Sequence, residues 1–192
     1  VYGPIGSVTE ITPEEWLEAI RINLYGAFLV SREACRQMKQ TGGGNIVLFS
    51  GGGAATPFPY YTAYACGKVG VVRFAETLAQ EVEPFNIRVN CIAPGFVITR
   101  LHDDTIKAGE LAGQKFFETT IKQIESGGVS PSVSAGAAVF LISDEAKEIT
   151  GKFVAAPYDG WDSWPKHLEE LQGTDIFTLR RIVPRDRGMD WQ

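Results

Sequence analysis

The sequence has no long hydrophobic run, little histidine, few cysteines and no excess of positive charge. Of its 192 residues, 44% are hydrophobic and 21% are charged, a composition that excludes disorder and collagen. The longest sparsely charged stretch, 49–67, is interrupted by Gly and Pro, so we expect no membrane span. A net charge of −5 gives nucleic acid no attractive field. We therefore expect a cytoplasmic globular protein that binds neither membranes nor nucleic acid.

Cysteine and histidine are too sparse for a disulfide framework or a metal site. Cys35, Cys66 and Cys91 are widely spaced and form no C-x-x-C pair, so we interpret all three as buried thiols. His102 and His167 stand 65 residues apart and lack the further ligands that a metal needs. We predict that both histidines lie on the surface and that no metal is bound.

Hydrophobic periodicity and chain-breaking residues divide the sequence into alternating helices and strands. Thr12-Pro13-Glu14-Glu15 is a capping box with proline at the first helical position. We predict helices over 13–40, 61–83, 111–124 and 132–143, and strands over 45–49, 87–91 and 153–156. The long crossovers indicate parallel neighbouring strands and an α/β fold. Chemistry in such sheets collects beyond the carboxyl ends of the strands, here in the loops from Ser50, Pro94 and Pro157.

Tyr64 and Lys68 stand four residues apart, on one face of a predicted helix. A phenol ordinarily titrates near about 10, so proton exchange near neutral pH requires a stabilised anion. A neighbouring ammonium can supply that stabilisation. Because this pair occurs by chance in many helices, its meaning depends on the surrounding sequence.

That surrounding sequence resembles the short-chain dehydrogenase/reductase family. The resemblance rests on YACGKVGVV at 64–72, ETLAQE at 76–81 and IRVNCIAPG at 87–95, with NLYGAF at 23–28, PGFVIT at 94–99 and FLISD at 140–144 in the same order. It covers about residues 1–160. It implies a Rossmann-like, doubly wound parallel sheet in three layers.

The resemblance also implies roles for individual residues. Tyr64 is the expected general acid/base, and Lys68 is expected to bind the nicotinamide ribose and to lower the pKa of Tyr64. Asn23 is expected to bind a water that links Lys68 to solvent, or else to be an amide at a helix kink. The residues expected to contact NAD or NADP are Tyr64, Lys68, Pro94, Gly95, Val97 and Thr99.

One expected catalytic residue is out of place. The family's substrate-orienting serine stands 13 residues before the tyrosine, where this sequence has Gly51, and Ser50 comes one residue earlier. Adjacent strand residues point to opposite faces, so Ser50 faces away unless the three consecutive glycines turn the chain. We list Ser50 as a catalytic candidate, with Thr56, Thr62 or a backbone amide as substitutes.

The two ends of the chain depart from the family pattern. No initiator methionine precedes Val1, and no glycine-rich turn opens a first βαβ unit. We therefore expect an N-terminally truncated chain in which residues 1–160 are the last two-thirds of the domain and lack its first strands. Residues 161–192 form an extension whose aromatic start, together with Tyr158, predicts packing on the domain or on a partner subunit.

The sequence thus predicts an NAD(P)-dependent oxidoreductase that transfers hydride between nicotinamide and a small-molecule secondary alcohol or ketone. We expect a homodimer or homotetramer, and negligible cofactor affinity and activity for the 192-residue chain alone. The alternative is a non-catalytic fragment or pseudoenzyme that acts through a dimer surface built from the helices at 13–40 and 61–83.

Overall fold

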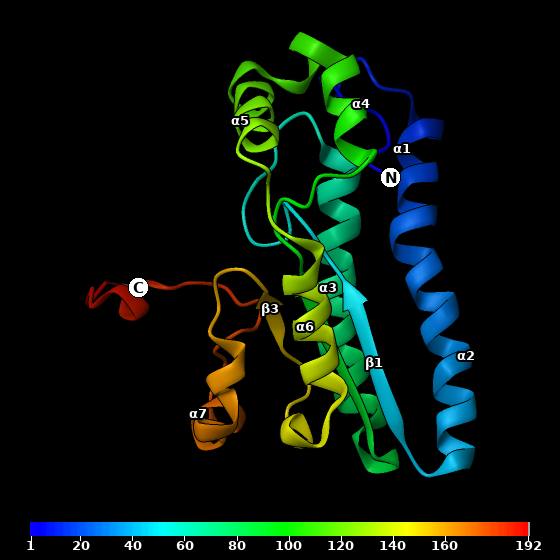
Figure 1. Cartoon of the computed structure of the whole chain (residues 1–192), viewed down its shortest axis with the longest axis vertical. Helices are drawn as coiled ribbons and strands as arrows, with labels where there is room; N and C mark the ends of the chain where they lie inside the picture. The colour runs from blue at the N-terminus through cyan, green and yellow to red at the C-terminus, as the bar shows by residue number, and fades with distance from the viewer. Residues whose placement is uncertain (192) are drawn as a thin grey trace.

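A computed structural model describes residues 1–191 and shows a parallel sheet with helices on both faces (Figure 1). The strands are β1 (Gly44–Phe49), β2 (Ile87–Ala93) and β3 (Phe153–Ala155), in the order β1-β2-β3. Gly44 pairs with Ile87, and Cys91 pairs with Phe153. The predicted α/β fold with parallel strands is confirmed, and the sheet has three strands within the described residues.

The helices lie close to their predicted positions, with two additions. They are α1 (Pro13–Ile20), α2 (Gly26–Thr41), α3 (Thr62–Val82), α4 (Leu101–Ala108), α5 (Gln114–Glu125), α6 (Pro131–Ile142) and α7 (Leu168–Gly173). A π-helical segment, Arg21–Tyr25, joins α1 to α2. Helices α4 and α7 were not predicted, because both sequences are short and polar. No helix of the described residues has the length and apolar character needed to cross a bilayer.

Side chains of β1 and β2 alternate between two cores on opposite faces of the sheet. Ile46 and Val89 belong to the core that α2 and α3 cover. Val47 and Ile92 belong to the core formed with α6 and the residues after β3. Because successive strand residues point to opposite faces, α3 and α6 lie on different sides of the sheet.

Helix α1, the π-helical segment and α2 form one long helical stretch, and the π-helical segment brings this stretch against α3. Asn23 lies in this segment, and its Nδ2 donates hydrogen bonds to the carbonyl oxygens of Ala19 at 3.0 Å and Val1 at 2.8 Å. Side-chain bonds of this kind compete with the helical backbone pattern. A Cβ on Gly67 of α3 would lie 3.0 Å from the Asn23 Cβ. The small residue at 67 therefore permits the two helices to approach closely beside Tyr64 and Lys68.

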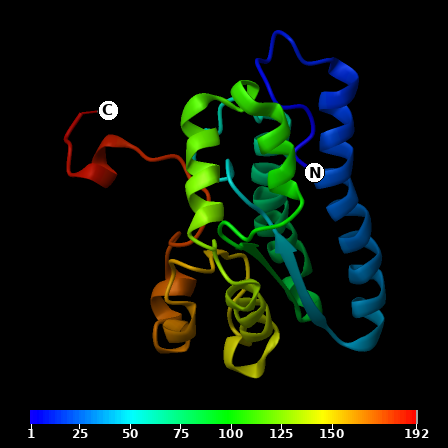
Figure 2. The ribbon, with the colours of Figure 1, turned by 45° about the horizontal axis from the view of Figure 1, so that its top comes forward.

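The chain beyond β3 packs against α6 and covers the outer edge of β3. The Phe153 amide donates to the Phe177 carbonyl at 2.8 Å, so Phe177 occupies the place of a further strand. Trp164 and Leu171 are buried in the core with α6, and the Trp164 ring centroid lies 4.5 Å from that of Phe177. Figure 2 shows α7 beside α6, with the final segment extending away from the body. Tyr158 is 79% exposed, so it does not pack in the core of its own domain, and its packing on a partner subunit stays a prediction.

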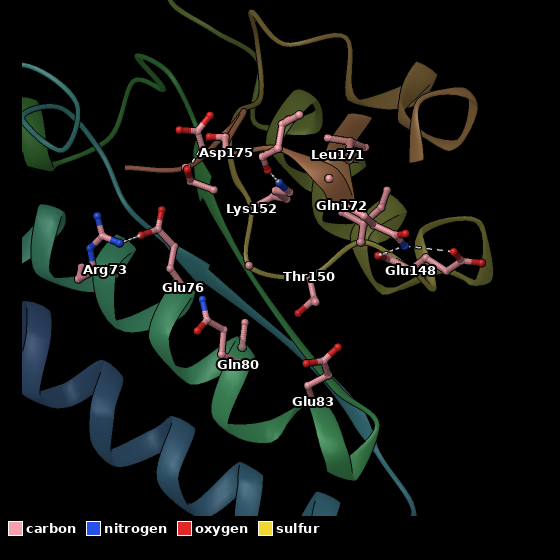
Figure 3. A pocket seen from close by; sticks show the side chains of 16 residues that line it. Arg73, Glu76, Gln80, Glu83, Glu148, Thr150, Lys152, Leu171, Gln172 and Asp175 are labelled. Carbon is pink, nitrogen blue, oxygen red and sulfur yellow. Dashed lines mark hydrogen bonds and ion pairs between the residues drawn. The ribbon is translucent and has the colours of Figure 1, made fainter. Parts of the chain in front are cut away.

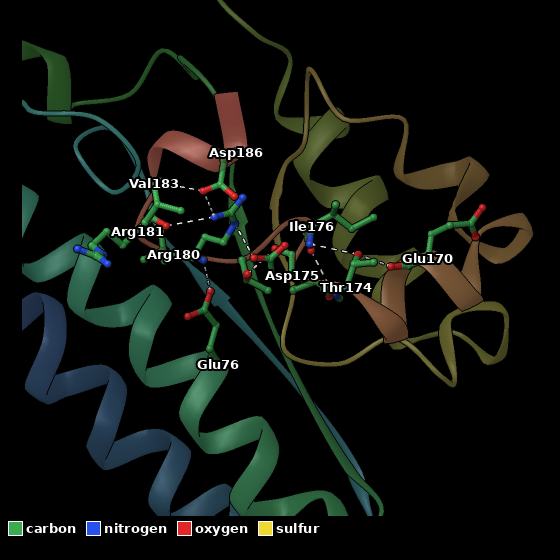
Figure 4. Close-up of polar contacts among 12 residues, drawn as sticks. Glu76, Glu170, Thr174, Asp175, Ile176, Arg180, Arg181, Val183 and Asp186 are labelled. Atoms are coloured by element: carbon green, nitrogen blue, oxygen red, sulfur yellow. Dashed lines mark hydrogen bonds and ion pairs between the residues drawn. The ribbon is translucent and has the colours of Figure 1, made fainter. Parts of the chain in front are cut away.

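Charged side chains also attach this extension to α3 (Figure 4). Glu76 is buried, and its Oε1 accepts a hydrogen bond from the Leu179 amide at 2.6 Å. Burial raises the pKa of the Glu76 carboxyl above its ordinary value. Within the extension, Arg180 Nη1 lies 2.6 Å from Asp186 Oδ2. The extension is thus tied to the body by both apolar packing and polar contacts.

Candidate active site

The loops at the carboxyl ends of the three strands meet around one cavity of about 450 Å³. Residues 51–53 follow β1, residues 94–97 follow β2, and Tyr158 follows β3, and all of them line this cavity. Its volume lies in the range of small-molecule sites. The sequence predicts the chemistry in these same loops.

Tyr64 lines this cavity from the first turns of α3 and is 6% exposed. Its ring makes edge contacts with Tyr2, at a centroid distance of 4.8 Å, and with Phe58, at 6.1 Å. This burial raises the pKa of Tyr64 to about 12. The expectation of a lowered Tyr64 pKa is wrong for this structure, because the loss of solvation outweighs any stabilisation of the phenolate by the neighbouring ammonium. The phenol is therefore protonated at neutral pH.

Lys68 lies one turn further along α3, as the four-residue spacing predicts. Its Nζ lies 5.7 Å from the centroid of the Tyr64 ring and donates a hydrogen bond to the Phe49 carbonyl at 3.0 Å. Burial lowers the pKa of the Lys68 ammonium. The bond to Phe49, the last residue of β1, fixes the ammonium at the end of the strand that leads into the cavity.

Gly51, and not Ser50, lies against the Tyr64 hydroxyl. Ser50 is buried, and its Oγ donates to the Lys68 carbonyl at 3.0 Å. A Cβ on Gly51 would lie only 2.2 Å from Tyr64 Oη. The glycines do not turn Ser50 towards the phenol, so alternation along the strand leaves it on the other face. The structure brings Tyr64, Lys68 and Gly51 together and directs Ser50 to the backbone of α3. Of the two threonines named as substitutes, Thr56 is exposed but lines the cavity, whereas Thr62 Oγ1 accepts a hydrogen bond from Trp16 Nε1 at 3.2 Å.

Of the residues expected to contact a nicotinamide, Tyr64, Pro94, Gly95, Val97 and Thr99 line the same cavity, and Lys68 does not. Gly95 has a φ of +78°, and a Cβ there would lie 2.6 Å from Cγ of Pro157, so a side chain at this position is excluded. The Val97 amide donates to the Gly95 carbonyl at 3.1 Å. Thr99 Oγ1 accepts a hydrogen bond from the Leu101 amide at 3.3 Å. Cavity size, a neutral phenol and this close backbone fit the nicotinamide end of a dinucleotide.

His102 is a site residue that the sequence analysis missed. It was predicted on the surface, but it is 6% exposed and lines the cavity. Its ring lies 3.9 Å from the Phe96 ring, centroid to centroid, and its Nδ1 accepts a long 3.4 Å hydrogen bond from the Thr99 amide. Burial lowers the pKa of the imidazole. The only signal in the sequence was the position of His102 three residues after Thr99.

The cysteines correct a second prediction. Cys35 and Cys91 are buried as expected, but Cys66 is exposed. The buried face of α3 includes Ala63, Tyr64 and Gly67, and helical periodicity turns residue 66 away from it. Within residues 1–191, no three His, Cys, Asp or Glu side chains gather closely enough to hold a metal ion.

A larger cavity of about 750 Å³ lies between α3 and the C-terminal extension (Figure 3). Several of its charged side chains are engaged in holding the extension. Arg73 Nη1 lies 2.7 Å from Glu76 Oε2, and Lys152 Nζ donates to the carbonyls of Thr174 at 3.4 Å and Ile176 at 3.1 Å. We therefore place the chemistry at Tyr64 and assign this second cavity to packing of the extension.

Comparisons with known proteins agree with this arrangement. Residues 2–157 match the protein family described as Enoyl-(Acyl carrier protein) reductase. Human dehydrogenase/reductase SDR family member 4 is 32% identical over 149 residues, which are 78% of this chain and 52% of that protein. The NAD-dependent glycerol dehydrogenase of Listeria innocua is 35% identical over 145 residues, 74% of this chain and 55% of that protein. The chain thus spans about half the length of these curated relatives.

A solved structure extends the likeness to three dimensions. The L-sorbose reductase of Gluconobacter frateurii, complexed with NADPH and L-sorbose, aligns with a TM-score of 0.66 at 28% identity, over 80% of this chain and 62% of that one. Fold, motif order and sequence matches agree, and the chain belongs to the short-chain dehydrogenase/reductase family.

Proposed function

We propose that this chain carries the catalytic residues of an NAD(P)-dependent oxidoreductase that interconverts a small secondary alcohol and a ketone. The observation that supports this most strongly is the protonated phenol of Tyr64 in the cavity where the loops of all three strands meet. Lys68 lies one turn away, is bound to the end of β1, and places a positive charge near the Tyr64 ring.

The proton chemistry follows from the neutral phenol. Bound nicotinamide supplies or accepts the hydride at the substrate carbon. In the reductive direction, Tyr64 Oη donates its proton to the substrate oxygen as the carbonyl becomes an alcohol, and in the oxidative direction the phenolate takes that proton back. The Lys68 ammonium stabilises the phenolate in both directions. Gly51 provides no hydroxyl at this point, so we assign Ser50 to the support of α3 and not to the substrate oxygen.

The proposed cofactor is NAD or NADP. One relative is named as NAD-dependent, and the aligned L-sorbose reductase is complexed with NADPH. On this chain we propose that Tyr64 and Lys68 contact the nicotinamide riboside, while the backbone around Gly95 and Val97 and the Thr99 hydroxyl border the rest of that end of the cofactor. Asn23 keeps Lys68 in position through the contact of its helix with α3.

The test is oxidation of NADH or NADPH by the whole protein with a set of uncharged ketones. Tyr64→Phe removes the proton donor and should lower kcat by at least about 100-fold. Tyr158→Phe is the matched control, because Tyr158 lines the same cavity but is 79% exposed, and it should change kcat by less than about 3-fold. Equal activity of the Tyr64→Phe protein and its parent would refute the proposal.

We propose that the protein assembles as a homodimer through α3 and the long helical stretch formed by α1, the π-helical segment and α2. Tyr25, Leu29 and Val30 are apolar and exposed on this helical stretch, and contiguous patches of this kind mark contacts between proteins. Light scattering should give twice the monomer mass, and Val30→Glu should reduce it to the monomer. Unchanged mass in the Val30→Glu protein would contradict this interface. A dimer without oxidoreductase activity would instead favour the non-catalytic alternative.

A further inference from the structure

The cavity at Tyr64 contains a second polar group that the proposed reaction does not use. His102 is buried, yet it lines the cavity. Its Nδ1 is engaged by the Thr99 amide, and within residues 1–191 its Nε2 has no hydrogen-bond partner. Nε2 is also not fully sealed from solvent. The open side of the imidazole therefore faces the cavity.

The hydrogen bond from Thr99 determines what Nε2 can do. A ring nitrogen that accepts an N–H bond carries no proton, so the neutral imidazole bears its proton on Nε2. Burial lowers the pKa of His102 and keeps this neutral form at neutral pH. Packing against Phe96 holds the plane of the ring. His102 thus presents one fixed hydrogen-bond donor to the cavity.

Tyr64 and His102 stand at different places along the cavity wall. The Tyr2 ring lies in contact with both, with its centroid 4.8 Å from that of Tyr64 and 6.3 Å from that of His102. Thr99 Oγ1 already accepts from the Leu101 amide, and Thr56 is exposed. Besides the buried Tyr2 and Tyr64 hydroxyls, the His102 Nε2–H is a buried donor in this cavity for which a ligand can supply the acceptor.

The rest of the lining excludes charged substrates. It includes the aromatic and aliphatic side chains of Tyr2, Phe58, Phe96, Leu101 and Phe116, and no Lys, Arg, Asp or Glu among the described residues lines it. A carboxylate or phosphate bound here would be buried without a partner of opposite charge, at a cost of several kcal/mol. An uncharged molecule meets no such penalty.

We propose that His102 is a specificity-determining residue whose Nε2–H donates a hydrogen bond to a second oxygen of the substrate, remote from the reacting carbonyl. The inference rests on the proposed function and names its substrate class. That class is an uncharged ketone or secondary alcohol that carries a further carbonyl, hydroxyl or ether oxygen.

The kinetic test compares methyl butyl ketone with the three hexanediones that share its methyl ketone. The readout is the kcat/KM for a dione divided by the kcat/KM for methyl butyl ketone. Because diketones react faster intrinsically, this ratio in each variant is compared with the same ratio in the parent. His102→Asn retains an acceptor in place of Nδ1 and loses the donor of Nε2, whereas His102→Gln places an amide donor near Nε2. The best dione should lose about 10-fold in this ratio in His102→Asn and less than about 3-fold in His102→Gln.

A structural role for His102 predicts the reverse order, because asparagine and not glutamine keeps the contact with the Thr99 amide. An unchanged ratio in both variants, or loss in His102→Gln alone, would overturn the inference.

A binding experiment separates the inference about His102 from the proposed function. The chain has two histidines, so His167→Gln leaves one imidazole to follow by NMR. The best-binding hexanedione should shift the His102 ring signals at concentrations where methyl butyl ketone does not. Absence of that shift overturns the inference, whereas its presence without ketone reduction overturns only the proposed function.

Discussion

Adding a single methyl group at Gly51 should displace the proton donor. The backbone of Gly51 is outside the left-handed region, so alanine is compatible with its conformation. The new Cβ would lie 2.2 Å from Tyr64 Oη and 3.2 Å from Cζ. Carbon and oxygen need a contact of at least 3.4 Å, so the phenol must move by about 1 Å.

The size of the effect follows from that displacement. A 1 Å misplacement of a reacting group can lower the rate by about 100-fold. The Tyr64 ring is confined by Tyr2 and Phe58, so overpacking should also lower the free energy of unfolding by about 1–3 kcal/mol. For a chain of this size that corresponds to a fall in Tm of about 2–10 °C. We expect Gly51→Ala to show both losses.

Two further variants make the comparison specific. In Gly52→Ala, the next residue along, the Cβ would meet Phe58 Cε1 at an ordinary 3.5 Å, so kcat and Tm should remain close to those of the parent. Gly51→Ser carries the same Cβ but adds a hydroxyl in reach of Tyr64 Oη, which should recover up to about 10-fold of the lost activity. Steady-state reduction of a ketone and calorimetry measure the two quantities. A Gly51→Ala protein with the Tm and kcat of its parent would refute this packing of the phenol.

Three other outcomes are expected. Phe116 lines both the catalytic cavity and a neighbouring apolar cavity of about 560 Å³, so Phe116→Ala should raise kcat/KM for bulky aromatic ketones relative to small ones by about 10-fold; an unchanged ratio would contradict the shared wall. Because burial raises the pKa of Glu76, its carboxylate opposes folding at neutral pH and this opposition disappears on acidification. Glu76→Gln should therefore match or exceed the parent Tm at pH 7 and lose any advantage as the pH falls to about 4, below the ordinary pKa of a glutamate, whereas Glu76→Ala should lose about 1–3 kcal/mol at both values; equal losses in the two variants would argue against this. The absorbance difference between the parent and Tyr64→Phe on alkaline titration should show a phenol midpoint near 12, and a midpoint below 10 would show that burial does not control this pKa.

The arrangement of the catalytic pair was accessible from local sequence. Four-residue spacing on a helix puts Tyr64 and Lys68 on one face in any context, and the strand alternation that turns Ser50 away from its neighbour is equally local. The capping box at Thr12 and the buried runs of the strands likewise predicted where most of the helices and strands begin and end. For these features, short-range geometry was sufficient.

The electrostatics and the second polar group depend on contacts between distant segments. The pKa of Tyr64 rises because Tyr2, far away in the chain, helps to exclude water from it. His102 becomes buried because its ring, on a short polar helix, packs against Phe96 in the preceding loop. Neither contact leaves a pattern in the sequence, so both had to come from the structure.

The central claim is that Tyr64 gives its proton to a carbonyl that receives hydride from nicotinamide. The most direct measurement is a single turnover of the whole protein with a nicotinamide deuterated at its transferable position, followed by mass spectrometry of the alcohol. The account predicts deuterium on the carbinol carbon with the parent, and at least about 100-fold slower transfer with Tyr64→Phe at the same cofactor occupancy. Transfer at the parental rate in the Tyr64→Phe protein, or no deuterium in the parental product, would contradict it.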